Sequence, residues 1–251
     1  QINKCVDGGL VERCRFQLLD YGVYAPTTTG TTYMYHSVIR DCLFEAIGNY
    51  GVYLGYGNNA NAVQRCQFQN GYPAAAGAGV GLYIKYSGNI LVEGCSFRSH
   101  KNGIVLAGTT GTKIDGCYFE SSYDGTEGHT PASGAYIDMD DFDDGGTDRN
   151  CEGIWITKCS ASPAYNVSTN PAHAFVKARQ TRSLTIMDNW FTSVSSSLLD
   201  LDATVWGLVA VNNYAYDGGA TLIATIPNGT VAFMQDIYPA TGLPRLYLPD
   251  Y

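Results

Sequence analysis

A six-residue motif, aliphatic-x-x-Cys-x-Phe, recurs five times in the first half of the chain. The copies are VERCRF, IRDCLF, VQRCQF, VEGCSF and IDGCYF, which contain Cys14, Cys42, Cys66, Cys95 and Cys117. Weaker copies contain Cys159, Asn189 and Asn213, so the spacings from Cys14 onward are 28, 24, 29, 22, 42, 30 and 24 residues. A unit with such a period cannot bury its apolar face alone. Stacking of successive copies therefore predicts a solenoid.

A second repeated unit, Gly-aliphatic-x-aliphatic, follows each Phe. It reads GVYA, GVYLGY, GLYIKY, GIVLAG and GAYIDM at Gly22, Gly51, Gly81, Gly103 and Gly134. The alternation predicts strands with one buried face. Gly, β-branched and aromatic residues dominate, and the Leu frame of a leucine-rich repeat is missing. We predict an all-β chain folded as a single-stranded right-handed parallel β-helix of about eight coils, over residues 1–226.

The C-terminal residues 227–251 break the repeat, with three prolines between Val231 and Tyr251. Solenoids need atypical ends, so this segment is predicted to be a cap or a subunit contact. A net charge of -8 argues against nucleic acid as a partner, because a phosphate backbone requires a basic patch. No apolar run is long enough to insert into a membrane.

The cysteines are predicted to form one internal column. Equivalent residues of successive coils lie about 4.8 Å apart in a parallel β-helix. Inert packing of small buried thiols is the favoured interpretation over a metal or redox site, because zinc sites use closely spaced ligand pairs. Disulfides between adjacent coils remain open on distance alone.

The outward side chains of the Gly-led strands are candidate ligand contacts. Alignment on the glycines gives one outward column of Tyr24, Tyr53, Tyr83, Val105, Tyr136, Phe175, Asp200 and Ile223, and a second that includes Lys85, Asp138, Lys177 and Asp202. Aromatic rings on a long sheet can stack on sugars or simply pack on one another. The candidate substrate-binding residues are Tyr53, Tyr83, Tyr136, Phe175, Lys85 and His129.

The coil from Cys117 to Cys159 is the longest, and its two insertions, residues 123–133 and 140–151, are predicted to wall a groove. We expect the catalytic centre there, with Asp138 central, a second carboxylate from Asp202, Asp140 or Asp141, and Lys177 between. If the two aspartates lie in one column two coils apart, the separation of their Cβ atoms is about 9.6 Å. The alternatives are a surface charge ladder and a Ca²⁺ site in the Asp-rich loop after Asp138. No other cofactor is expected.

The Gly-aliphatic strands, the Cys/Asn column and the sparse charge resemble the pectate-lyase-like β-helix superfamily, most of all the central domain of bacteriophage tailspike depolymerases. The resemblance implies cleavage of a bacterial surface polysaccharide, a homotrimer, and a place outside the cell or on the virion surface. A non-catalytic receptor-binding or structural protein is the alternative. Polygalacturonase motifs are absent apart from the Asp140-Asp141 pair, and the alginate-epimerase motif is absent. Tailspikes share no universal motif, so no catalytic residue is carried over from them.

Overall fold

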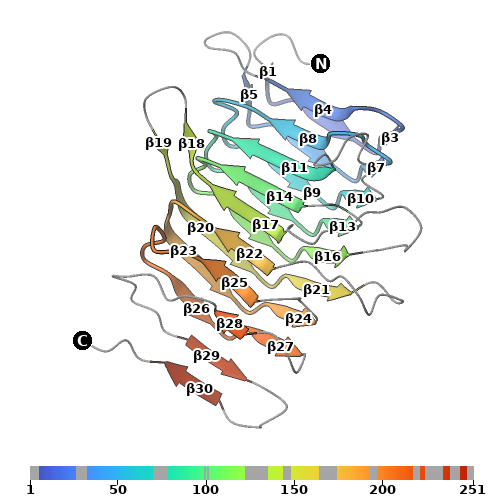
Figure 1. Ribbon diagram of the computed structural model, residues 1–251. Coiled ribbons are helices and arrows are strands. Elements are labelled where there is room, and N and C mark those ends of the chain that lie inside the picture. The colour runs from blue at the N-terminus through green and yellow to red at the C-terminus, as the bar shows by residue number, and fades with distance from the viewer. Residues whose placement is uncertain are drawn as a thin grey trace.

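The chain winds into coils whose strands stack as parallel sheets along one axis (Figure 1). The computed structural model describes residues 6–26, 33–69, 79–98, 100, 102–121, 135–143, 148–163, 174–192, 197–216, 221–223, 234–237 and 244–247. In each full coil the chain passes through sheet 1, sheet 2 and sheet 3 in that order.

Sheet 1 precedes the Cys position and contains β2 (Leu10–Glu12), β6 (Val38–Arg40), β9 (Ala62–Gln64), β12 (Leu91–Glu93), β15 (Lys113–Asp115), β20 (Cys151–Thr157), β23 (Thr181–Met187) and β26 (Val209–Val211). Sheet 2 follows the Cys position and contains β3 (Arg15–Gln17), β7 (Leu43–Glu45), β10 (Gln67–Gln69), β13 (Ser96–Arg98), β16 (Tyr118–Ser121), β21 (Ser160–Pro163), β24 (Trp190–Thr192), β27 (Tyr214–Tyr216), β29 (Met234–Ile237) and β30 (Pro244–Tyr247).

Sheet 3 carries the Gly-led strands β4 (Tyr21–Ala25), β8 (Tyr50–Leu54), β11 (Val80–Lys85), β14 (Asn102–Ala107), β17 (Ala135–Asp140), β22 (Ala174–Ala178), β25 (Ser197–Leu201) and β28 (Thr221–Ile223). Two small sheets pair β1 (Val6–Asp7) with β5 (Met34–Tyr35), and β18 (Phe142–Asp143) with β19 (Asp148–Arg149). The prediction of an all-β parallel β-helix is confirmed.

The Cys column lies inside the solenoid as predicted. Cys42, Cys66, Cys95, Cys117 and Cys159 are buried, and Cys14 at the end of the column is exposed. All seven described cysteines are free thiols, so no disulfide joins adjacent coils among them. The Cys66 thiol donates to the Ile39 carbonyl of the preceding coil at 3.6 Å. Burial raises the pKa of Cys42 to about 11, as inert packing requires.

The residue before each column position makes the turn from sheet 1 to sheet 2. Its φ lies between 50° and 62° in eight coils, at Arg13, Asp41, Arg65, Gly94, Gly116, Lys158, Asp188 and Asn212. This left-handed conformation is costly for most side chains, and asparagine, aspartate and glycine tolerate it best. Because the turn repeats from coil to coil, its solvent-facing side chains form a second external column.

A stack of phenylalanines explains the glycines of sheet 3. Phe44, Phe68, Phe97 and Phe119 are buried and stack at centroid distances of 4.7 to 5.1 Å. A Cβ atom on Gly51 would lie 2.6 Å from Cδ1 of Phe68 and 2.6 Å from the carbonyl oxygen of Gly81. Glycine is required there because no side chain fits beside the phenylalanine stack.

Beyond the last full rung, β29 pairs in parallel with β27 and in antiparallel with β30 (Figure 1). The expected boundary at residue 226 lies within 224–233, outside the described residues, so the division into a β-helix and a C-terminal cap stays a prediction. No described segment is a helix of the length and apolarity that a membrane span requires.

Candidate functional site

The outer face of sheet 3 is divided into an aromatic half and a charged half. The backbone register aligns Tyr24, Tyr53, Tyr83, Val105, Asp138, Lys177 and Asp200 in one outward column. A neighbouring column begins with Tyr21 and Tyr50. The tyrosines therefore occupy β4, β8 and β11, the charges occupy β17, β22 and β25, and β14 with Val105 separates them.

The tyrosine half is a tightly packed surface. The rings of Tyr53 and Tyr83 stack with centroids 5.3 Å apart and an interplanar angle of 4°. Tyr24 and Tyr50 extend the packing at 5.1 Å from Tyr53 and Tyr83 respectively. Burial raises the pKa of Tyr53 to about 12 and that of Tyr83 above its usual value. These hydroxyls therefore stay protonated and can donate hydrogen bonds at neutral pH.

The structure corrects two predicted substrate contacts, Tyr136 and Phe175. Their side chains are 6% and 0% exposed, and they belong to the core. They occupy the inward place held by glycine in earlier coils. Ala161 interrupts the phenylalanine stack after Phe119, and the Tyr136 and Phe175 rings lie 5.7 and 5.6 Å from Phe119 in the volume that this alanine leaves.

Asp138 is a half-buried carboxylate in the charged half of the face. Its Oδ1 lies 3.6 Å from Nζ of Lys177 on the next rung, and its Oδ2 accepts a hydrogen bond from the Asn102 amide at 3.4 Å. Burial raises the pKa of Asp138 against the opposing effect of Lys177, and nearby Asp140 raises it further. A carboxyl group in this state is suited to hold a proton that a surface aspartate would lose.

Asp200, not Asp202, is the carboxylate two rungs from Asp138 in the same column, with Lys177 between them. Asp200 Oδ1 accepts a hydrogen bond from Nη2 of Arg179 at 2.9 Å. Asp202 lies in the adjacent column, where its Oδ2 is 3.4 Å from Nε of Arg179. The Oδ1 atom of Asp202 accepts hydrogen bonds from the backbone and hydroxyl groups of Thr204, so it braces a turn. The predicted pairing of Asp138 with Asp202 across Lys177 is therefore wrong.

The remaining predicted residues lie at the margins of this face. Asp140 ends β17, and its Oδ1 accepts a hydrogen bond from the backbone of Asp141 at 2.9 Å. Lys85 follows Tyr83 by two residues, and its rung partner is Ala107. His129 and the insertion 123–133 lie outside the described residues.

The second insertion of the long coil contains the antiparallel β18–β19 hairpin, which rises beside the earlier rungs (Figure 1). The guanidinium carbon of Arg149 lies 4.9 Å from the ring centroid of Tyr86, which follows β11 two coils earlier. A pocket of about 440 Å³ lies there, lined in part by Tyr86, Arg149, Glu152 and Arg182. The described residues that line this pocket include none of the predicted catalytic residues, so the groove expected at Asp138 stays a prediction.

The described residues contain no group of three or more His, Cys, Asp or Glu side chains that could hold a metal ion. Asp144, in the Asp-rich loop proposed as a Ca²⁺ site, lies outside them.

Sequence reasoning missed Asn102, Arg149 and the role of Asp200. Alignment on the buried aliphatic residues would have placed these side chains correctly. The pair Ile104–Ile137 puts Asp138 beside Val105, and the pair Val176–Leu199 puts Asp200 beside Lys177. No periodic signal could have placed Arg149, because its position depends on the path of a long insertion.

Comparisons with known proteins agree with this architecture. The sequence model of the family described as "Right handed beta helix region" matches residues 79–237. No curated protein sequence matches the chain.

Among solved structures, PfbA, a surface adhesin of Streptococcus pneumoniae, superposes with a TM-score of 0.64 at 12% identity, over 92% of this chain and 66% of that chain. ORF18 of Geobacillus virus E2 gives a TM-score of 0.49 at 12% identity, over 91% and 54%. Pectate lyase Bsp165PelA from Bacillus sp. N165, in complex with trigalacturonate, gives 0.45 at 11% identity, over 91% and 82%. At such identities the likeness to the adhesin shows the fold alone.

Proposed function

This chain belongs to the right-handed β-helix family, and from that premise we propose that it binds a bacterial surface polysaccharide along the outer face of sheet 3 and hydrolyses it. The observation that carries the proposal is the environment of Asp138. This half-buried carboxyl group has a raised pKa and faces a second, ion-paired carboxylate, Asp200, two rungs away.

The two aspartates have different surroundings, as general acid and general base require. Two rungs separate their Cβ atoms by about 9.6 Å, and side-chain tilt brings the carboxyl groups into the roughly 6.5–9.5 Å range of inverting hydrolysis. Asp138 gives its proton to the glycosidic oxygen as the bond between that oxygen and the anomeric carbon breaks. Asp200, paired with Arg179, takes a proton from the water that attacks this carbon. Lys177 positions the Asp138 carboxyl group, and Arg179 positions that of Asp200.

The tyrosines supply the binding surface next to these carboxylates. Tyr53 and Tyr83 form a flat stacked pair one rung from Val105, which borders Asp138. C–H-rich pyranose faces pack on such rings, and the protonated hydroxyls donate hydrogen bonds to sugar oxygens. In the proposal the glycan lies along the solenoid axis, across β8, β11, β14 and β17. Arg149 and Arg182 at the hairpin pocket favour a glycan that carries carboxylates on that side.

A bacteriophage tailspike is the assembly in which we place this activity, on the virion surface and as a homotrimer. The reasons are the sequence resemblance and the extended tyrosine face, which on a monomer would be a row of partly exposed rings.

A second candidate function is a non-catalytic glycan receptor. The observation in its favour is that Asp138, Asp200 and Asp202 all lie within 4 Å of a cationic side chain, as in a charge ladder that only holds the face together.

Digestion of a panel of capsular and O-antigen polysaccharides separates the two functions. Hydrolysis by the Asp138–Asp200 pair produces new reducing ends and no unsaturated uronates. Unsaturated uronates would mean β-elimination and would refute the acid–base assignment. A glycan that binds without being shortened would support the receptor.

A further inference from the structure

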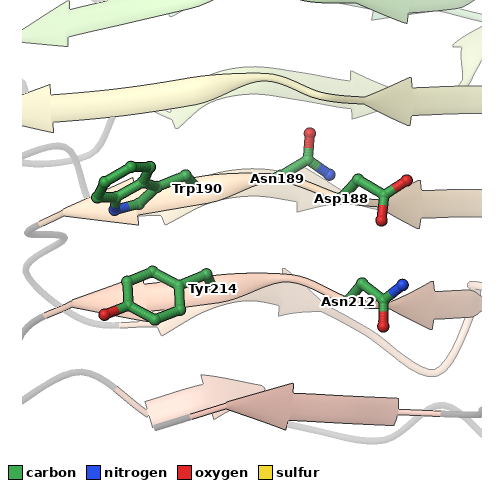
Figure 2. Close-up of a pocket in the computed structure, with 5 residues that line it drawn as sticks. All are labelled: Asp188, Asn189, Trp190, Asn212 and Tyr214. Carbon is green, nitrogen blue, oxygen red and sulfur yellow. The ribbon is translucent and has the colours of Figure 1, made fainter. Parts of the chain in front are cut away.

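A separate pocket of about 430 Å³ lies where sheet 1 turns into sheet 2, on the rungs of β24 and β27. It is lined by Asp188, Asn189, Trp190, Asn212 and Tyr214, and Figure 2 shows these five side chains. None of them belongs to the outer face of sheet 3. Two residues, Trp190 and Tyr214, lie toward one end of the pocket in Figure 2, and Asp188 and Asn212 toward the other.

The aromatic end is unusually exposed for its residue types. Trp190 is 59% exposed, and its ring centroid lies 5.6 Å from that of Tyr214 on the next rung, with an interplanar angle of 82°. Tryptophan loses the free energy of apolar burial in such a position, so an exposed Trp beside a second ring is a frequent sign of a contact surface. The flat Trp190 ring is available to a ligand from the solvent side.

The polar end is formed by two turn residues on adjacent rungs. Asp188 and Asn212 have φ angles of 57° and 55°, and the Asp188 backbone donates to the Val211 carbonyl at 3.1 Å. Both residues are exposed. Within the described part of the chain, no ion pair or hydrogen bond occupies either side-chain head group. In the same column, by contrast, Asp41 binds Arg65 at 2.8 Å.

The floor of the pocket is fixed by the asparagines that replace cysteine in the internal column. The Asn189 amide oxygen accepts a hydrogen bond from the Cys159 backbone at 2.8 Å, and its nitrogen donates to the Ile156 carbonyl at 3.0 Å. Asn213 repeats the pattern by accepting from the Asn189 amide at 2.9 Å and donating to the Ile186 carbonyl at 2.9 Å. These stronger bonds hold the backbone on both sides of Asn189 more rigidly than a thiol can.

The change from Cys to Asn therefore coincides with the pocket. Asn189 and Asn213 stand directly between the turn residues and the aromatic residues on the two rungs that form it. Earlier rungs have cysteine in the column and Arg15, Leu43, Gln67, Ser96, Tyr118 and Ser160 in the place of Trp190. Only one of these is aromatic, and its turn residue, Gly116, has no side chain.

We propose that this pocket binds a neutral pyranose residue of a glycan. The sugar's apolar face stacks on Trp190, Tyr214 borders it, and the Asp188 carboxylate and Asn212 amide hydrogen-bond its hydroxyl groups. The five described lining residues include one acid and no base, which favours a neutral sugar over a uronate. The site stands apart from the proposed Asp138 centre, and it does not depend on cleavage there.

Intrinsic tryptophan fluorescence can monitor this site, because the chain has three tryptophans and one of them, Trp190, lines the pocket. Trp155 and Trp206 are 44% and 53% exposed, so a Trp155→Phe/Trp206→Phe variant keeps the fold and leaves Trp190 as the sole indole. Cellotetraose, maltotetraose and a neutral galactotetraose are titrated, with tetragalacturonate as the anionic counterpart. We expect at least one neutral sugar to shift the Trp190 emission saturably, and tetragalacturonate to have no effect.

Calorimetry on single variants then assigns the contacts. Trp190→Ala should weaken the affinity for the neutral sugar about tenfold or more, and Asp188→Ala and Asn212→Ala should weaken it by several fold. The matched control Trp155→Ala should leave the affinity unchanged. Asp138→Asn should also leave it unchanged, which distinguishes this site from the proposed cleavage site.

Three results would overturn the proposal. They are no emission shift with any neutral sugar, an affinity that survives Trp190→Ala, and an emission that changes with protein concentration in the absence of sugar, which would make this face a contact between copies of the chain.

Discussion

At the scale of single residues, the interior of the solenoid accepts a polar side chain only if its charge or its hydrogen-bonding groups find a partner. The Cys66 thiol donates to the carbonyl groups of Ile39 and Gln64 at 3.6 and 3.4 Å, and its contact with Cys95 and its burial raise its pKa. Such a thiol is a small apolar group with a weak hydrogen bond. A charged replacement would have no cation within the stack.

Cys66→Asp should therefore reduce the free energy of unfolding by about 3 kcal/mol or more, because it buries an unpaired charge or forces protonation. Cys66→Ser should lose less, since its hydroxyl can use the same carbonyl groups. Urea denaturation measures both. The matched control is Cys14→Asp at the exposed end of the column, which should change stability by less than about 0.5 kcal/mol. A Cys66→Asp variant as stable as its parent would show that the internal column is misplaced.

At the scale of strands, the side chains of sheet 2 and sheet 3 fill the same part of the core, so a large residue in one sheet requires a small residue in the other. A glycine in sheet 3 accompanies a phenylalanine in sheet 2, as at Gly51 and Phe68, and larger residues return where Ala161 interrupts the phenylalanine stack. Replacing a glycine of β8 by a residue with a side chain should therefore affect stability differently from replacing a glycine of a turn.

Gly51→Ala should destabilise the protein by about 1–3 kcal/mol, because the new Cβ would overlap both Phe68 and the Gly81 backbone. Gly116→Asn should be close to neutral. Its φ of 62° suits asparagine, nothing lies within 4 Å of its Cβ position, and Asn212 already occupies the equivalent turn. Thermal unfolding of the two variants is the measurement, and equal losses would contradict the shared-volume explanation.

The repeat predicted the strands and the internal column, since Cys and Phe recur at fixed spacing from the buried aliphatics. The register of sheet 3 was predicted correctly as far as Val105 and again at Asp200. Alignment on the glycines failed at β17 and β22, where Tyr136 and Phe175 stand in the glycine place, and it displaced these two strands by two residues. The displacement predicted Tyr136 and Phe175 as exposed, and it placed Asp138 and Lys177 in the column of Asp202 instead of that of Asp200. The β18–β19 hairpin could not be predicted, because its contact with Tyr86 crosses two coils and leaves no local pattern.

At the scale of the whole molecule, the solenoid presents different chemistry on different faces. Sheet 3 combines tyrosines with the Asp138–Lys177–Asp200 row, and the turn between sheets 1 and 2 carries the Trp190 pocket. Because the coils stack in parallel and each contributes one residue to each column, every coil lengthens such a surface. A long glycan suits this geometry better than a compact ligand does.

The proposed trimer is tested by sedimentation velocity. We expect a species of about three times the 27.1 kDa chain mass, because association covers part of the apolar surface that a monomer would expose. A monomer at all concentrations would contradict the trimer, and glycan binding would then be the one proposed role left for the tyrosines of sheet 3.

The most direct test of the account is the rate of polysaccharide cleavage by Asp138→Asn, compared with Asp41→Asn. Asp41 is also an ion-paired aspartate, but it lies on the turn between sheets 1 and 2. With folding and glycan binding retained, Asp138→Asn should lower turnover by at least about 10²-fold, because asparagine cannot donate the proton that the leaving oxygen needs. The parent enzyme should lose activity as the pH rises through the raised pKa of Asp138, since only the protonated acid works. Asp41→Asn should cleave at the parental rate. Normal turnover in Asp138→Asn would contradict the account and remove the catalytic role of this face.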